Sequence, residues 1–259
     1  MQAYYKLAAL LCVFHLSLLT ASAQSEGGLL LGAEAEKKLD KKLSVSLEGE
    51  LRTRNNFKTM DRWSVGLGAS YKFTKWLKAD AGYRLLDYNN RDKKEYYTSS
   101  KGNEKVEWRP SYWSVKHRFY ASVTVDYKFS NGLKLALRER WQYNYRPAMS
   151  TERYKGKISE HTLYPDTGYV RKGKGQNQLR SRFQIEYDKK RALFTPYANI
   201  ELYHSWGIEK IRYTVGTNIH LSKQHSLEAF YRYQDVKHVY DDDNDPDMHY
   251  IGMGYKFKF

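Results

Sequence analysis

The chain has almost no cysteine, and no long hydrophobic run follows its first 23 residues. Its single cysteine, Cys12, lies inside the apolar N-terminal stretch, and residues 24–259 contain none. If that stretch is removed, disulfides, thiolate metal sites and cysteine nucleophiles are excluded. No later stretch offers the roughly 20 consecutive apolar residues that a membrane-spanning helix needs. A form of this chain that spans a membrane would therefore have to cross it with strands.

The N-terminal stretch is typical of a secretory signal peptide. Lys6 supplies the positive n-region, Leu7 to Leu19 form the apolar h-region, and Ala21 to Ala23 form a small-residue cleavage site. We expect residues 1–23 to be a signal peptide and residues 24–259 to form one domain.

Aromatic residues are abundant although the chain is polar on average. The mean hydropathy is −0.79, yet aromatic residues make up 15% of the chain, with 24 tyrosines. This combination is typical of strands that alternate apolar and polar residues and carry aromatic girdles at both ends. The formal net charge is +15, but the arginines alternate along strands instead of clustering, so we predict no nucleic-acid partner.

Apolar residues recur at every second position along most of the chain, which indicates strands. The clearest runs are Leu43 to Leu51, Trp63 to Phe73, Leu77 to Leu85 and Trp113 to Phe129. These runs are 9 to 17 residues long, so each reaches the roughly 9–11 residues that a tilted membrane-spanning strand needs. Further strands are expected at 133–145, 178–188, 197–206, 209–221, 226–236 and 248–259. The predicted fold is all-β, a transmembrane antiparallel up-and-down β-barrel of about 10–12 strands.

The connections between these strands alternate in length. Short polar turns are expected at 40–42, 74–75, 130–132, 188–190 and 222–225, and long links at 88–111, 146–176 and 236–248. Short turns at one end and long loops at the other are typical of a barrel in the outer membrane of a Gram-negative bacterium, with the turns in the periplasm. Leu29 to Lys38 fits this scheme poorly, because an eleventh strand there would begin outside. Either another strand lies within 146–176, or this segment is not an ordinary wall strand.

The polar face of each strand is predicted to line the barrel interior. The charged residues that we predict to line the interior are Glu48, Glu50, Arg52, Arg84, Arg118, Asp126, Arg138, Arg140, Arg180, Arg182, Glu186, Glu201, Arg212, Glu228 and Arg232. Two hypotheses follow. The charges could form the ion-paired plug of a structural barrel, or they could line a narrow, porin-like pore that prefers anions because arginine is in excess.

We predict no catalytic, cofactor-binding or metal-binding residues. The acidic run 241–247 could hold calcium, but Pro246 stands where such a loop needs glycine, so we interpret the run as a solvated loop. The protein is not expected to be an enzyme. The alternative is an outer-membrane lipid hydrolase, for which His204, Ser205 and His249 are the candidates.

The last strand ends on an aromatic residue with no polar tail. Tyr255, Phe257 and Phe259 alternate with Lys256 and Lys258. We interpret the three aromatic residues as a C-terminal signal for the barrel-assembly machinery. The other expected partners are outer-membrane lipid and lipopolysaccharide, and the barrel is expected to be a monomer.

The sequence resembles a family of outer-membrane barrels of Bacteroidetes-type and other Gram-negative bacteria, known as domain of unknown function 2490. The resemblance is carried by KKLDKKLSVSLEGELRTR, RWSVGLGASYKFTKWLKADAGYRL, IEKIRYTVGTNIHLSKQHSLEAFYRYQ and HYIGMGYKFKF. It implies the barrel fold and the compartment, and it implies no catalytic residue. A further alternative is a surface binding module that holds a glycan or an envelope partner through loops 88–111 and 146–176.

Overall fold

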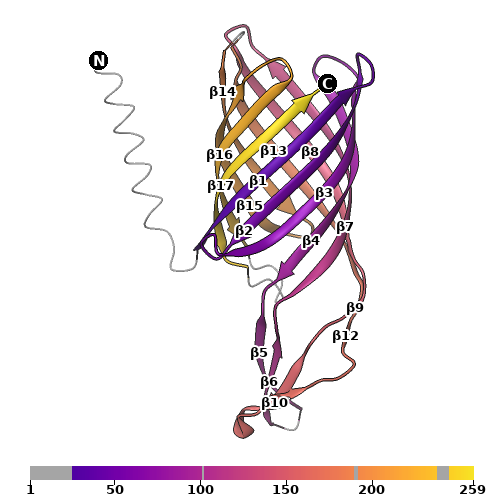
Figure 1. The fold of residues 1–259 in the computed structure, drawn as a ribbon, viewed down its shortest axis with the longest axis vertical. Helices are drawn as coiled ribbons and strands as arrows, with labels where there is room; N and C mark the ends of the chain where they lie inside the picture. The colour runs from indigo at the N-terminus through magenta and orange to yellow at the C-terminus, as the bar shows by residue number, and fades with distance from the viewer. Residues whose placement is uncertain (1–24, 101, 190–191, 238–244) are drawn as a thin grey trace, which may run out of the picture.

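The computed structural model describes residues 25–100, 102–189, 192–237 and 245–259 (Figure 1). The predicted signal peptide, residues 1–23, lies outside this part of the chain. So do residues 241–244 of the acidic run. Among the described residues, no helix has both the length and the apolar character needed to cross a membrane.

Eleven long strands close into a barrel, in the order β1–β17–β16–β15–β14–β13–β8–β7–β4–β3–β2. Their bounds are β1 Ser25–Lys38, β2 Leu43–Arg54, β3 Thr59–Lys72, β4 Leu77–Asn90, β7 Tyr112–Lys128, β8 Leu133–Arg146, β13 Lys174–Tyr187, β14 Phe194–His204, β15 Ile208–His220, β16 His225–Val236 and β17 Asp247–Lys258. The predicted all-β barrel fold is confirmed, and the strand number lies within the predicted range.

The alternation seen in the sequence sorts the side chains onto two faces. Leu47, Leu67 and Val123 point outward and are exposed, whereas Arg52 and Ser122 point inward and are buried. Closure of the sheet pairs the backbone of every wall strand on both sides and leaves no edge strand. The barrel therefore has an apolar exterior and a polar interior.

The segment that fitted poorly in the sequence is a full wall strand. β1 pairs with β17 in parallel, with Leu31 opposite Met253, and with β2 in antiparallel. The indigo and yellow strands lie side by side in Figure 1. Every other junction of the barrel is antiparallel. The expectation of a wholly antiparallel barrel is thus corrected at this junction, because with an odd number of strands the first and the last run in the same direction.

The two longest loops form a sheet of their own beyond one end of the barrel, which we call the loop sheet (Figure 1). Its four strands lie in the order β11–β10–β6–β5. A smaller two-stranded ladder pairs β9 with β12. The bounds are β5 Lys93–Thr98, β6 Glu104–Arg109, β9 Met149–Ser150, β10 Tyr154–Lys157, η1 Ile158–Glu160, β11 Tyr164–Pro165 and β12 Val170–Arg171. We call the end of the barrel that carries the loop sheet the loop end. The short turns and the C-terminus lie at the opposite end, which we call the turn end (Figure 1).

Candidate functional site

The charges predicted to line the interior all lie on barrel strands and point into the lumen. They alternate with the exposed apolar residues of the same strands. The structure gathers most of them into two ion-paired groups and one cavity that opens toward the turn end, and Glu50 of the second group also lines that cavity.

The first group is built around Glu201 on β14. Its carboxylate accepts hydrogen bonds from Arg138 at 2.7 Å, Arg180 at 2.8 Å and the hydroxyl of Tyr203 at 2.8 Å. Arg212 lies 3.9 Å from the same carboxylate. The guanidinium groups of Arg180 and Arg212 lie 4.5 Å and 4.4 Å from the centre of the Tyr203 ring. One carboxylate and one aromatic ring therefore hold three cations from three strands.

Neutral side chains extend this group toward the loop end. Gln142 and Gln178 are buried, and their amides are joined by a hydrogen bond of 2.5 Å. Gln178 also donates to Glu209, as does Gln176 at 3.0 Å. Neither Gln142 nor Gln178 was predicted to line the interior, because the prediction was limited to charged residues. The alternation on β8 and β13 places Gln142 and Gln178 inward and could have shown them.

The second group is built around Glu50 on β2. Its carboxylate accepts hydrogen bonds from Arg52 and Arg62, both at 2.8 Å. Arg62 also donates to the hydroxyl of Tyr88 at 2.5 Å. Arg52 and Arg62 expose only 4% and 7% of their surface. Buried arginines of this kind require partners, because an unpaired buried charge is strongly unfavourable.

The remaining predicted charges have separate partners. Arg118 donates to Asn144 at 2.7 Å. Asp126 pairs with Lys134 at 3.1 Å, and Glu186 accepts a hydrogen bond from Gln184 at 3.0 Å. The guanidinium of Arg140 lies 4.4 Å from the centre of the Tyr120 ring. Arg182 on β13 is directly opposite Glu201 on β14. Glu228 accepts a hydrogen bond from the hydroxyl of Tyr197.

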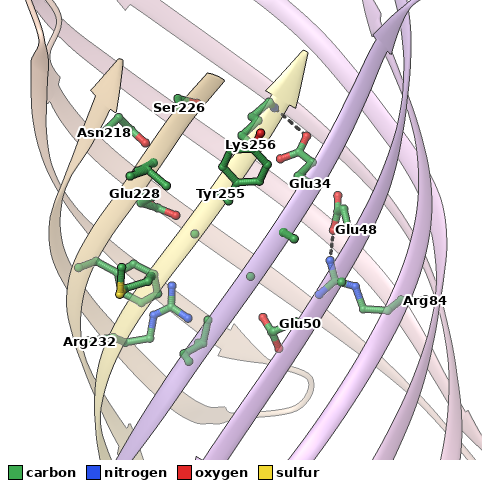
Figure 2. A pocket seen from close by; sticks show the side chains of 18 residues that line it. Glu34, Glu48, Glu50, Arg84, Asn218, Ser226, Glu228, Arg232, Tyr255 and Lys256 are labelled. Carbon is green, nitrogen blue, oxygen red and sulfur yellow. Dashed lines mark hydrogen bonds and ion pairs between the residues drawn. The ribbon is translucent and has the colours of Figure 1, made fainter. Parts of the chain in front are cut away.

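A cavity of about 320 Å³ opens the lumen toward the turn end (Figure 2). Glu48 and Arg84 form an ion pair on its wall, and Glu34 pairs with Lys256 at 2.7 Å. Arg232 lies at the lower part of the view, toward the loop end. The walls carry charges of both signs.

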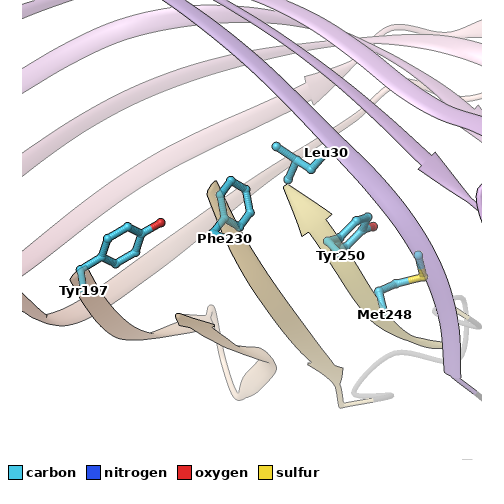
Figure 3. Packing of buried hydrophobic residues seen from close by; sticks show 5 residues of the cluster. All are labelled: Leu30, Tyr197, Phe230, Met248 and Tyr250. Atoms are coloured by element: carbon cyan, nitrogen blue, oxygen red, sulfur yellow. The ribbon is translucent and has the colours of Figure 1, made fainter. Parts of the chain in front are cut away.

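An apolar cluster of inward side chains lies beside this cavity (Figure 3). It consists of Leu30, Tyr197, Phe230, Met248 and Tyr250, all buried. The ring of Phe230 occupies the space over Gly252, where an added Cβ would lie 2.0 Å from a ring carbon. This glycine therefore lets an inward aromatic ring lie flat against the wall and narrow the interior.

The C-terminal aromatic residues lie on the outward face at the turn end. Tyr255 and Phe259 are exposed. The hydroxyl of Tyr255 is 2.6 Å from His225 Nδ1, and Phe257 lies against the same imidazole at 5.0 Å between ring centres. Their role as an assembly signal stays a prediction.

The hydrolase candidates named from the sequence lie in three different surroundings. His204 Nε2 is 3.2 Å from the hydroxyl of Ser181 on the outward face. Ser205 donates to the inward Glu209, and His249 Nδ1 is 2.5 Å from the hydroxyl of Tyr231. Among the residues that the structure describes, no group of three or more histidine, cysteine or acidic side chains is placed to hold a metal ion.

The loop sheet carries a second cavity, of about 450 Å³. The guanidinium of Arg153 lies 3.5 Å from the centre of the Tyr169 ring. Asp166 accepts a hydrogen bond from Arg153 Nε at 2.7 Å and lies 3.1 Å from Lys155 Nζ. Hydrogen bonds from Lys155 and Arg153 hold the pKa of Asp166 below its usual value. The cavity thus combines an aromatic face, cations and a carboxylate kept ionised at neutral pH.

These features define a class of protein: a closed β-barrel with an apolar exterior, a charged and ion-paired interior and one elaborated end. The chain belongs to the family described as "Protein of unknown function (DUF2490)", whose model matches residues 27–245. A search of curated proteins found no match.

The solved structures that are similar to this chain include two domains of autotransporters. One is the translocator domain of the autotransporter NalP from Neisseria meningitidis, with 8% identity and a TM-score of 0.53, covering 82% of this chain and 74% of that one. The other is the β domain of the Bordetella autotransporter BrkA, with 14% identity and a TM-score of 0.48, covering 84% of this chain and 82% of that one. At 8% identity, the likeness to the NalP domain shows the fold alone.

Proposed function

We propose that this protein spans the outer membrane of a Gram-negative bacterium as a structural barrel that does not conduct ions freely. The proposed location is supported by the apolar outward face, by wall strands of 11 to 17 residues and by short turns at one end with long loops at the other. The similarity to a barrel from an autotransporter agrees with it.

The observation that supports the structural role is the burial of the two ion-paired groups around Glu201 and Glu50. Arg52, Arg62, Arg212 and Glu201 each expose 8% or less of their surface. Side chains fill the interior of barrels of about eight strands, and aqueous channels are found in barrels of about 16–18 strands. With eleven strands, this barrel lies nearer the first size than the second. We therefore favour the plug over the narrow anion-preferring pore.

Single-channel recording in planar bilayers tests this proposal. We expect purified wild-type protein to insert without current steps. The variant Tyr203→Ala removes the ring between Arg180 and Arg212 and is expected to produce small steps with anion preference, because the arginines remain. Heat-dependent mobility on SDS gels serves as the folding control for both proteins. Regular anion-selective steps from the wild type would show that the lumen is a pore instead.

A second candidate function is binding at the loop sheet, as expected for loops 88–111 and 146–176. Its support is that the two loops pair with each other, through β6 and β10, instead of extending separately. Ordering long loops costs conformational entropy, and a shared sheet holds the cavity beside Arg153 and Tyr169 in one shape. An aromatic ring beside charged and hydroxyl groups suits a glycan that carries acidic groups.

A glycan array with detergent-purified protein tests this binding role. We expect acidic glycans to bind the wild type, and Arg153→Ala to weaken binding about tenfold or more, because it removes the cation and the contact with Tyr169. Lys157→Ala is the matched control, since Lys157 is an ion-paired cation of the same sheet but does not line the cavity. Equal binding by wild type and Arg153→Ala would contradict this candidate.

A further inference from the structure

Glu139 is an acidic side chain on the apolar, outward face of the barrel. It lies on β8 between Leu137 and Trp141, which are 50% and 45% exposed, and its own side chain is exposed on the same face. A charged group on the lipid face of a membrane barrel is unfavourable, by an amount that depends on depth. Ionisable residues at such depth usually mark a functional site.

The carboxylate of Glu139 belongs to a cluster with a serine and a histidine. Ser181 lies directly opposite on β13 and donates from Oγ to Glu139 Oε2 at 2.7 Å. His204, at the end of β14, places Nε2 3.2 Å from the same Oγ. Three adjacent strands thus bring an acid, a hydroxyl and an imidazole to one point, with the hydroxyl in the middle.

The other outward histidines have different surroundings. His117 is 2.8 Å from the hydroxyl of Tyr83, His225 bonds Tyr255 and His249 bonds Tyr231. Such tyrosine–histidine pairs satisfy polar groups within an aromatic girdle. Only the cluster at His204, among these four described positions, combines an imidazole with a serine hydroxyl and a carboxylate.

The depth of the cluster suggests its substrate. Leu133, Leu135 and Leu137 precede Glu139 on the outward face of β8, and Trp141, Tyr143 and Tyr145 follow it toward the loop end. Aromatic side chains gather where the acyl chains meet the headgroups. In the proposed membrane orientation, the cluster therefore lies at the level of acyl ester bonds in the outer leaflet.

We propose that Ser181, Glu139 and His204 form a hydrolytic site for the acyl esters of outer-membrane lipids. Ser181 Oγ attacks the ester carbonyl carbon. Its proton passes to Glu139 Oε2, which already accepts a hydrogen bond from Oγ. His204 Nε2–H donates to Oγ and orients the hydroxyl. The ester C–O bond then breaks, and the leaving alcohol oxygen takes the proton from Glu139.

Water completes the cycle. It attacks the acyl-serine carbonyl and gives a proton to Glu139, the bond to Oγ breaks, and Oγ takes that proton back. The products are a free fatty acid and a lipid that has lost one acyl chain. The site uses no cofactor in this scheme, and nucleophile activation by an adjacent base is the usual logic of serine hydrolysis.

The experiment measures fatty acid released by full-length mature protein in detergent micelles. One arm contains diacyl phosphatidylethanolamine and the other lipopolysaccharide, so that the two possible ester sources are distinguished. We expect release in one arm, its abolition in Ser181→Ala, and a drop of about 10²–10⁴-fold in Glu139→Gln, as for loss of a general base. Treatment with a fluorophosphonate should label Ser181, as seen by peptide mass spectrometry.

Controls separate the site from the fold. His117→Gln, an outward histidine bonded to a tyrosine, should keep full activity, whereas His204→Gln should lose most of it. Glu139→Leu should abolish release and raise the midpoint of urea unfolding, because it replaces a charged group on the lipid face with an apolar one. If the Glu139 carboxylate had only a structural role, its removal would lower that midpoint.

The inference rests on the proposed membrane location, and its failure can be recognised separately. A folded, heat-modifiable barrel that releases no fatty acid in either arm and leaves Ser181 unlabelled would overturn the hydrolytic site alone. Equal release by wild type and Ser181→Ala would also overturn it. Protein that stays soluble and monomeric without detergent would instead remove the membrane location.

Discussion

The variant Glu201→Gln is expected to lower the free energy of unfolding by about 3–5 kcal/mol, the usual cost of removing one partner from a buried ion pair. Glu201 accepts hydrogen bonds from Arg138 and Arg180, and Arg212 lies within 3.9 Å. The glutamine amide can replace only part of these hydrogen bonds, because its nitrogen is a donor and would face the donor groups of the arginines. Three cations would then remain inside the lumen without their shared counter-charge.

The low exposure of this group explains why the expected effect is large. The side chains of Glu201, Arg138 and Arg180 expose only 8%, 13% and 12% of their surface. Exposed ion pairs contribute little, because water screens them, but water has little access here. The arginines cannot lose their charge at neutral pH, so deprotonation cannot reduce the loss of stability that Glu201→Gln causes.

Urea unfolding of the barrel in lipid vesicles, followed by tryptophan fluorescence and by heat-dependent gel mobility, measures this effect. Glu186→Gln is the matched control, since Glu186 also points inward but accepts its hydrogen bond from the neutral Gln184. We expect the control to change the unfolding free energy by less than about 1 kcal/mol. If both variants unfold alike, the Glu201 group does not hold the lumen closed.

The paired variant Leu31→Cys with Met253→Cys is expected to form a disulfide in most molecules under mild oxidation. The two residues are directly opposite in the parallel pairing of β1 with β17 and lie on the outward face. Neighbouring strands are about 4.8 Å apart, within the range that a disulfide can bridge. Residues 24–259 contain no cysteine, so any disulfide comes from the introduced pair.

Non-reducing denaturing gels read out the result, because a link between the two ends of the chain closes nearly all of it into one loop. The pair Leu31→Cys with Leu51→Cys should also link, since those residues are opposite in the antiparallel pairing of β1 with β2. The pair Leu31→Cys with Val65→Cys should not, because β3 is two strands away. Linkage of Leu51→Cys with Met253→Cys instead would mean that β2 and β17 close a ten-stranded barrel without β1.

Much of the barrel wall could be predicted from the sequence, because a strand's side-chain alternation is a local property. The runs at Trp113 to Phe129 and at the C-terminus directly show which residues face out and which face in. Turn and loop lengths likewise show which strand ends lie together. The same alternation places Glu139 on the outward face, and a carboxylate among Leu137 and Trp141 was a signal that went unused.

By itself, then, the sequence determined the strands, the two faces and the asymmetry of the two ends, since each depends on residues close together in the chain. The tertiary structure alone decided how β1 joins β17, that two loops build one sheet, and that Glu139, Ser181 and His204 meet. Those contacts join residues 23 to 222 positions apart. They depend on strand order and register, which closure of the barrel fixes and no local pattern encodes.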